Sequence, residues 1–229
     1  KKNGIISSSD VMAYIEDNFK SKENNNTNPD YYSELESIMK KDYKNAVSMK
    51  DIENLKDQLS YSQKKYQEKW NRYIPPLDVL FDRWKNGENF GFGENSNVSS
   101  MSYIIGDVKV GKNCYIGPFT ILDGSGGLEI GDNTSIAAGV QIYSHDTVSR
   151  TLSGGKLSMS RARVSIGNNC FIGPSAIVTR GLKIGNMCFL GANSVLTFNL
   201  DDNQAASGNP CKIIGNVEID QEGISIKKK

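Results

Sequence analysis

A repeat of six residues in the second half of the chain limits the fold more than any other feature. Every sixth position carries a branched aliphatic side chain, at Ile166, Ile172, Val178, Ile184, Leu190 and Leu196. Four positions after each of the first five stands a small or slim residue, with Leu182 as the bulky exception. So short a period is typical of a β-solenoid, whose coils bury their aliphatic side chains by stacking on one another.

The repeat continues upstream with two irregularities. The earlier aliphatic positions are Val110, Ile116, Leu122, Ile130, Ile136 and Ile142, and two residues are added within 123–129. Between Ile142 and Ile166 the spacing is 24, which is 18 more than one repeat. A degenerate coil would need apolar residues at 148, 154 and 160, where the sequence has Val148, Gly154 and Ser160. We therefore favour an excursion over residues 147–163, and a degenerate coil remains the alternative.

Residues 1–88 lack the repeat and have the apolar spacing of helices. We expect two short helices before residue 40, a long helix that begins near Ser48 and ends at Pro75, and a short helix over 77–86. The apolar stripe of the long helix would pack against the solenoid or a neighbouring subunit. The predicted domains are thus a helical region over 1–88, a solenoid over 89–217 with the excursion, and a tail over 218–229. Residues 208–217 would leave the solenoid, and 219–226 alternate as one more strand.

Composition excludes several classes of function. The formal net charge of +1 gives no electrostatic reason for a nucleic-acid partner, and no apolar run approaches the roughly 20 residues of a membrane helix. Three of the four cysteines, Cys114, Cys170 and Cys188, stand at the slim position of the repeat and are expected to be buried thiols. A disulfide between Cys170 and Cys188 remains open. A chain with one histidine and no CxxC pair is not expected to bind a metal, and reduced cysteines favour a cytoplasmic location.

Several tracts together resemble the hexapeptide-repeat acyltransferases, above all the sugar O-acetyltransferases. They are GKNCYIGPFTILD (111–123), QIYSHD (141–146) with the loop after it, the restart RVSIGNN (163–169) and the closing SGNPCKIIG (207–215). The resemblance covers about 120 of the 229 residues and does not reach the helical region. It implies a left-handed parallel β-helix that forms a homotrimer. It also implies acetyl-CoA as co-substrate and a carbohydrate hydroxyl as acceptor, as in surface polysaccharides or their sugar precursors.

The resemblance also implies that a histidine just before the long loop is the catalytic base, which here is His145. A neutral imidazole can remove the proton of a hydroxyl as the oxygen attacks a thioester, without an acyl-enzyme. Either Asp123 or Asp146 would orient the ring. Because neighbours on a strand point to opposite faces, we favour Asp123. The alternative for Asp123 is that it only shapes the glycine-rich turn after it.

Binding residues follow from the same resemblance. The pantetheine arm of the coenzyme would use backbone groups of Gly191 and Ala192, and its phosphates would need cations. Lys212 matches a basic position near the adenine end, with Arg180 and Lys183 as further candidates. A separate observation concerns the excursion, which holds basic residues and no acidic one. Arg150 and Lys156 within it are therefore candidates for binding an anionic acceptor.

The chain also departs from the sugar acetyltransferases at two positions. Phe171 replaces a common tryptophan, and Pro174 has no N–H to donate to an oxyanion, so that donor must lie elsewhere. The Asn that precedes TILD and touches the sugar in galactoside-type enzymes also has no clear match in GPFTILD, so the acceptor cannot be carried over from the relatives. An N-acetyltransferase of a nucleotide-linked amino sugar is the alternative within the enzymes, since the same base would serve an amine. A non-catalytic β-helix scaffold is the alternative outside them.

Overall fold

The computed structural model describes residues 49–221 and 223–228. The chain divides into two compact units, Lys1–Ile74 and Pro75–Lys229. The two short helices predicted before residue 40, and the predicted helix start at Ser48, lie outside the described residues. None of the described helices is both long enough and apolar enough to cross a membrane.

Within the described part of the first unit, one long helix is present, α3 (Met49–Trp70). It ends earlier than predicted, because Asn71 adopts a left-handed conformation with φ 52° while its N–H donates to the Gln67 carbonyl at 2.9 Å. This left-handed residue after the last turn is a common helix terminator. Tyr73, which lies before the predicted end at Pro75, therefore follows the helix and is exposed.

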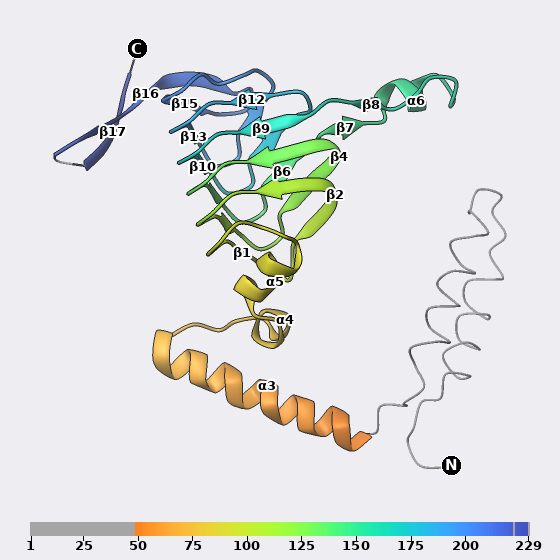
Figure 1. The fold of residues 1–229 in the computed structure, drawn as a ribbon, viewed down its shortest axis with the longest axis vertical. Helices are drawn as coiled ribbons and strands as arrows, with labels where there is room; N and C mark the ends of the chain where they lie inside the picture. The colour runs from red at the N-terminus through yellow and green to blue at the C-terminus, as the bar shows by residue number, and fades with distance from the viewer. Residues whose placement is uncertain (1–48, 222, 229) are drawn as a thin grey trace. The chain divides into compact units, whose positions relative to one another are not determined.

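The second unit is a parallel β-helix of the hexapeptide-repeat kind, left-handed as predicted (Figure 1). One sheet begins with six parallel strands, β1 (Asn97–Val98), β3 (Tyr115–Ile116), β5 (Ser135–Ile136), β10 (Phe171–Ile172), β13 (Phe189–Leu190) and β15 (Gln204–Ser207). The other sheet holds β2 (Tyr103–Val110), β4 (Ile121–Ile130), β6 (Gln141–Ile142), β9 (Val164–Ile166), β11 (Ile177–Val178), β12 (Lys183–Ile184) and β14 (Val195–Leu196). Every aliphatic position of the predicted repeat is buried in one continuous core.

The slim position of the repeat carries a ladder of hydrogen bonds from one coil to the next. Cys114 Sγ donates to the Gly131 carbonyl at 3.0 Å, and Thr134 Oγ1 donates to the Gly167 carbonyl at 3.0 Å. The further members of the ladder are Ser96 to Gly111, Cys170 to Gly185 and Cys188 to Asp201. All four cysteines are buried free thiols, as expected for the three at the slim position, and Cys170 and Cys188 do not form a disulfide. A slim donor here therefore satisfies a carbonyl of the next coil as well as filling space.

The two residues added within 123–129 form a bulge in β4. Gly106 of β2 pairs with Gly124 of β4, but Val108 already pairs with Leu128, so three residues of β4 lie opposite one of β2. Before the bulge β4 pairs with β6, and after it β4 pairs with β9. The bulge thus lies where β4 turns from one face of the β-helix to the next.

Two short helices, rather than the one predicted over 77–86, cover the first coil: α4 (Pro76–Leu80) and α5 (Arg83–Asn89). Asp82 separates them because it is extended and its carboxylate caps α5, accepting from the Lys85 N–H at 2.9 Å. Gly87 of α5 packs so closely that an added Cβ would lie 2.4 Å from the Ser96 carbonyl oxygen. Figure 1 shows α5 directly beneath β1, where it closes the end of the β-helix.

The carboxyl-terminal part differs from the prediction. Residues 208–217 do not leave the β-helix directly: β16 (Lys212–Asp220) first pairs antiparallel with β15 through residues 212–216, and its remaining residues extend beyond that strand. β17 (Gly223–Lys227) then pairs antiparallel with β16, so the end of the chain is a hairpin of two strands instead of a single strand. Asp220 and Gly223 face each other across the turn, and the hairpin projects from the β-helix (Figure 1).

The excursion is present where the sequence predicted it. It leaves the β-helix through β7 (His145–Asp146), forms α6 (Val148–Leu152) and returns through β8 (Ser160–Arg161), which pairs antiparallel with β7. In Figure 1 this segment projects sideways from the coils that carry β4 and β9. His145 therefore lies at the base of the excursion, on its first strand.

Candidate active site

The centre of the site is a contact between His145 and Asp123. The Nδ1 atom of His145 lies 2.6 Å from Asp123 Oδ2, and the same oxygen accepts from the His145 backbone N–H at 3.1 Å. The Asp123 side chain is 1% exposed, whereas the His145 side chain is 30% exposed. The imidazole is thus held from the buried side by a carboxylate and remains accessible to a substrate.

Asp123 is ionised because hydrogen bonds overcome the cost of burying its charge. Burial alone would raise the pKa of this carboxyl, but hydrogen bonds from Ser125, His145 and Ser144 lower the pKa to about 2. The Ser125 N–H donates to Oδ1 and the Ser144 N–H donates to Oδ2, each at 2.9 Å. A carboxylate that accepts from Nδ1–H leaves Nε2 of the neutral ring with its lone pair.

The glycine-rich bulge of β4 supports this pair, and sequence reasoning had assigned it no role beyond a turn. The Gly126 N–H donates to Ser144 Oγ at 2.7 Å, and the Ser144 carbonyl accepts from the Ala162 N–H at 2.9 Å. A Cβ at Gly126 would lie 2.5 Å from the Ser144 carbonyl oxygen, so only glycine fits there. Ser144 is fully buried and was missed from the sequence; its place between an inward aliphatic and the histidine was the available signal.

The two cations predicted for the acceptor, Arg150 and Lys156, are exposed on the excursion. Arg150 lies on α6, and Lys156 follows that helix. Exposed apolar side chains accompany them, since Leu152 is 83% exposed and Leu157 is 59% exposed. The surface of the excursion thus combines positive charge with apolar area. Arg161, which the sequence reasoning did not single out for the site, is the strand partner of His145 in the β7–β8 pair.

Arg180 and Lys183, predicted for the phosphates of the coenzyme, have different surroundings. Arg180 forms an ion pair with Asp146, the residue after the histidine, and this contact helps to lower the pKa of the Asp146 carboxyl. Asp146 is therefore engaged by Arg180, while Asp123 contacts the imidazole. Lys183 lies exposed on β12, and its N–H donates to the Asn199 side chain at 2.9 Å.

The late coils hold the remaining residues predicted for the coenzyme, Gly191, Ala192 and Lys212. Ser207 lies next to both Gly191 and Lys212. A Cβ at Gly191 would lie 2.3 Å from Ser207 Oγ, and Lys212 is the strand partner of Ser207. The Gly191 N–H is already used within the sheet, where it donates to the Ala206 carbonyl at 2.9 Å. Ala192 is exposed. The structure thus brings Gly191 and Lys212 to one region and places Lys183 on the other sheet.

Pro174 and Phe171 have structural partners of their own. The Pro174 carbonyl accepts from the Asn193 N–H at 2.9 Å in the next coil. The Phe171 ring stacks on Phe189, with centroids 5.7 Å apart and an interplanar angle of 9°.

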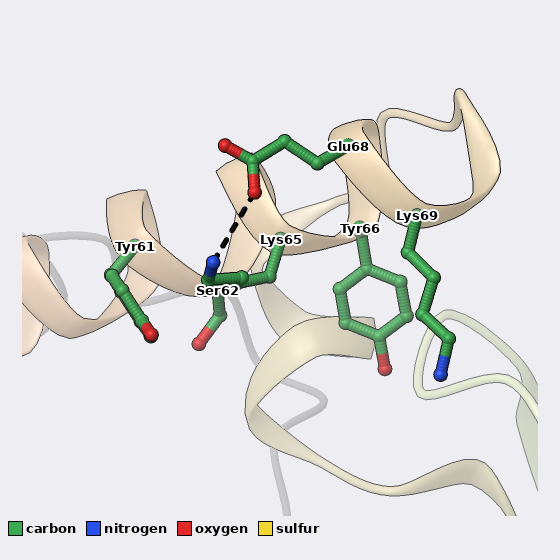
Figure 2. Close-up of a pocket in the computed structure, with 6 residues that line it drawn as sticks. All are labelled: Tyr61, Ser62, Lys65, Tyr66, Glu68 and Lys69. Atoms are coloured by element: carbon green, nitrogen blue, oxygen red, sulfur yellow. Dashed lines mark hydrogen bonds and ion pairs between the residues drawn. The ribbon is translucent and has the colours of Figure 1, made fainter.

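Figure 2 shows a separate hollow on α3, lined by Tyr61, Ser62, Lys65, Tyr66, Glu68 and Lys69. That hollow belongs to the first unit and contains neither a histidine nor a cysteine, so we do not assign it to the chemistry.

The fold and the site define a class of protein, a left-handed hexapeptide-repeat β-helix with a carboxylate–imidazole pair at the base of an excursion. The chain matches the family model described as hexapeptide repeat of succinyl-transferase over residues 104–144 and 163–198. The matched residues are those that carry the six-residue repeat of the sequence. The interruption of the match coincides with β7, the excursion and β8, so His145 itself lies outside the matched residues.

Solved structures with this fold include acyltransferases. AntD, an N-acyltransferase from Bacillus cereus in complex with dTDP and 3-hydroxybutyryl-CoA, is 23% identical with a TM-score of 0.50, over 55% of this chain and 71% of that chain. A galactoside acetyltransferase in complex with coenzyme A is 24% identical with a TM-score of 0.53, over 70% and 82%. A maltose O-acetyltransferase from Clostridium difficile 630 is 27% identical with a TM-score of 0.47, over 71% and 89%. The likeness to the first two structures agrees with the fold that the resemblance to the hexapeptide-repeat acyltransferases predicted.

Proposed function

We propose that the protein is an acetyl-CoA-dependent O-acetyltransferase that modifies a carbohydrate hydroxyl, with His145 as general base. The observation that carries this proposal is the 2.6 Å contact between His145 Nδ1 and the buried Asp123 carboxylate. Such a contact fixes the tautomer in which Nε2 can accept a proton, as a general base requires. The likeness of the fold to galactoside acetyltransferase with bound coenzyme A supports the choice of co-substrate.

In the proposed reaction the acyl group passes directly from the thioester to the acceptor. His145 Nε2 takes the hydroxyl proton as the acceptor oxygen attacks the carbonyl carbon of acetyl-CoA. The C–S bond then breaks, the imidazolium returns the proton to the thiolate sulfur, and the products are the ester and free coenzyme A. The ionised Asp123 stabilises the imidazolium during the step without taking a proton itself.

Binding of the two substrates is assigned as follows. The pantetheine arm of acetyl-CoA would pass the late coils at Gly191 and Ala192, and Lys212 would bind a phosphate. Arg180 and Lys183 are further phosphate ligands in this proposal, although the ion pair with Asp146 lowers the freedom of Arg180. Arg150 and Lys156 would contact the acceptor. No metal takes part in the proposed reaction, and a cytoplasmic location stays a prediction.

Acyl transfer to the amine of a nucleotide-linked sugar is the second candidate, and the exposed cations Arg150 and Lys156 favour it. These cations suit the phosphates of a nucleotide, and the protein of similar fold from Bacillus cereus is an N-acyltransferase in complex with dTDP. A screen of sugars, nucleotide sugars and amines with acetyl-CoA, read as release of free thiol, separates the candidates. Turnover with simple sugars supports O-acetylation of carbohydrate, and turnover restricted to amino sugars supports N-acetylation. Coenzyme A binding without turnover of any acceptor would instead indicate a non-catalytic scaffold.

Assembly is part of the proposal, because the His145 side chain is partly exposed at the surface of a single chain. We propose a homotrimer in which the acceptor and the coenzyme meet between two β-helices. Light scattering should then give three chains of 25.2 kDa, or a multiple of three. A stable and active monomer at micromolar concentration would exclude the shared site.

A further inference from the structure

The hairpin of β16 and β17 has one apolar face that the described chain leaves uncovered. Val217 and Ile219 alternate on β16, and their strand partners on β17 are Ile226 and Ile224. Ile219 is 61% exposed and Ile224 is 74% exposed, although β-branched aliphatics are normally buried. The opposite face is polar and carries an ion pair between Lys227 and Glu218. The hairpin is thus amphipathic, and its apolar face points to solvent.

This apolar face continues onto the β-helix. Strand partners in a sheet point to the same side, and the pairs Phe171–Phe189, Phe189–Ala205 and Ala205–Gly215 follow one another across the first sheet. Val217 lies two residues beyond Gly215 and therefore on the same side. A Cβ at Gly215 would lie 3.1 Å from Ile226 Cγ2, which places the Ile226 side chain over this glycine. We call this face, from Phe171 to Ile224, the apolar ribbon.

The strand at the end of the ribbon also has an open edge. β17 is the last strand of its sheet and pairs with β16 alone. Its five residues, Gly-Ile-Ser-Ile-Lys, are all exposed. Proteins usually protect such an edge with proline, a bulge or an inward charge, and β17 has none of these. Its single charged residue, Lys227, is on the polar face and is paired with Glu218. The edge is therefore suited to pairing with another strand.

The sequence of β17 is complementary to itself in the antiparallel direction. When two copies pair about a two-fold axis at Ser225, Ile224 of each copy lies opposite Ile226 of the other, and the two apolar ribbons join. Lys227 of one copy then lies opposite Gly223 of the other. Because Gly223 has no side chain, no like charge faces this lysine across the contact, and the lysine can keep its ion pair with Glu218. Side-chain pattern and charge thus agree in one register.

From these observations we propose that β17 is an assembly strand, which pairs antiparallel with β17 of a second copy of this chain and joins their two sheets. This contact is separate from the homotrimer of the proposed function, since it uses the hairpin and not the surroundings of His145. An isologous contact doubles whatever assembly the β-helices form. If the trimer also holds, the particle contains six chains, and if it does not, the particle contains two.

Light scattering on the full chain tests the proposal through a ratio of masses. Changing Ile219 and Ile224 together to lysine places four like charges in the joined ribbon, and the mass should fall to half that of the wild type. The matched control changes Ser225 to threonine, which keeps a small polar residue on the other face and should keep the wild-type mass. The absolute mass tests the trimer separately. A fall from six chains to three supports the trimer, and a fall from two chains to one contradicts it. A wild-type mass equal to that of the lysine variant overturns the proposal.

Disulfide trapping tests the register even if the lysine variant folds poorly. Directly opposite residues of an antiparallel pair have Cβ atoms about 4.5–5.5 Å apart, close to the distance that a disulfide spans. Ser225→Cys should therefore give a cross-linked dimer on a non-reducing gel under mild oxidation. Lys227→Cys, which lies opposite Gly223 in this register, should not, and the native cysteines are buried. Cross-linking of both variants alike, or of neither, contradicts the two-fold pairing of β17.

Discussion

Asp123 Oδ2 binds His145 twice, at the ring nitrogen Nδ1 over 2.6 Å and at the backbone nitrogen over 3.1 Å. The two residues are 22 positions apart in the chain and lie on adjacent coils of the β-helix. The backbone contact fixes where the strand lies, and the ring contact fixes how the imidazole is turned. A single buried carboxylate thus determines both the position and the orientation of the proposed base.

Replacing the proposed base should strongly reduce turnover without unfolding the protein. His145 lies outside the core of aliphatic side chains, so His145→Ala should keep its melting temperature and its binding of coenzyme A. A positioned general base contributes about 10² to 10⁴ in rate, and kcat should fall within that range. The measurement is release of free thiol with the acceptor found by screening. A variant that keeps near wild-type turnover would return the histidine to a structural role.

Removing the charge of Asp123 should weaken catalysis less than removing the imidazole. Asp123→Asn keeps the size of the side chain but can turn an NH₂ group toward Nδ1, which favours the wrong tautomer. We expect kcat to fall by about tenfold to a hundredfold, less than for His145→Ala. The control is Asp146→Asn, because Asp146 follows the same histidine but pairs with Arg180. Equal losses in the two variants would argue against a special role of Asp123.

Acid should weaken the fold through the same carboxylate. The pKa of Asp123 is lowered from 3.8 to about 2 in the folded chain, so its ionised form stabilises the fold above about pH 4. That contribution, about 2 kcal/mol by the relation between pKa and free energy, is lost as the pH falls from 4 to 2. Urea unfolding of the wild type and of Asp123→Asn over this range measures it. The difference between the two midpoints should shrink with acidification, and a difference independent of pH would contradict the assignment.

A buried hydroxyl in the core should be replaceable with a gain in stability. Thr120 is fully buried and its Oγ1 has no hydrogen-bond partner within residues 49–221 and 223–228, whereas Val140 occupies the matching position one coil later. Thr120→Val should raise the free energy of unfolding by about 1 kcal/mol. The matched control is Thr134→Val, which removes a donor to the Gly167 carbonyl and an acceptor for the Cys170 N–H. This control should lose about 1–3 kcal/mol, and a gain in it would contradict the account of the ladder.

The repeat was predictable because each aliphatic side chain of the repeat packs in the core between its counterparts in the adjacent coils. Ile172, for example, pairs with Leu190 one coil later and with Ile136 one coil earlier, so a period of six residues is sufficient to place it. The excursion was predictable for the same reason, as the spacing of 24 residues between Ile142 and Ile166 is much longer than the period. Asp123 was favoured over Asp146 from strand alternation, and the contact with the imidazole agrees with that reasoning, although the catalytic role stays a proposal.

Other features depend on contacts that a local pattern does not contain. α3 ends just before the left-handed Asn71 and not at Pro75. Proline is the usual sequence signal for the end of a helix, so the prediction placed the end there. The split of one predicted helix into α4 and α5 results from the extended conformation of Asp82. The hairpin was read as a single strand because nothing in residues 208–217 indicates that they return to pair with β15. Ser144 lacks any periodic signal, since its role comes from the bulge of another strand.

The excursion leaves and re-enters the β-helix through two strands that pair only with each other, β7 and β8. Its length is therefore not tied to the rise of the coils, and residues can be inserted into it or removed from it while every rung keeps its register. Natural selection can thus alter the part of the protein beside the histidine without reworking the scaffold. A substitution in any coil, by contrast, affects both of its neighbours.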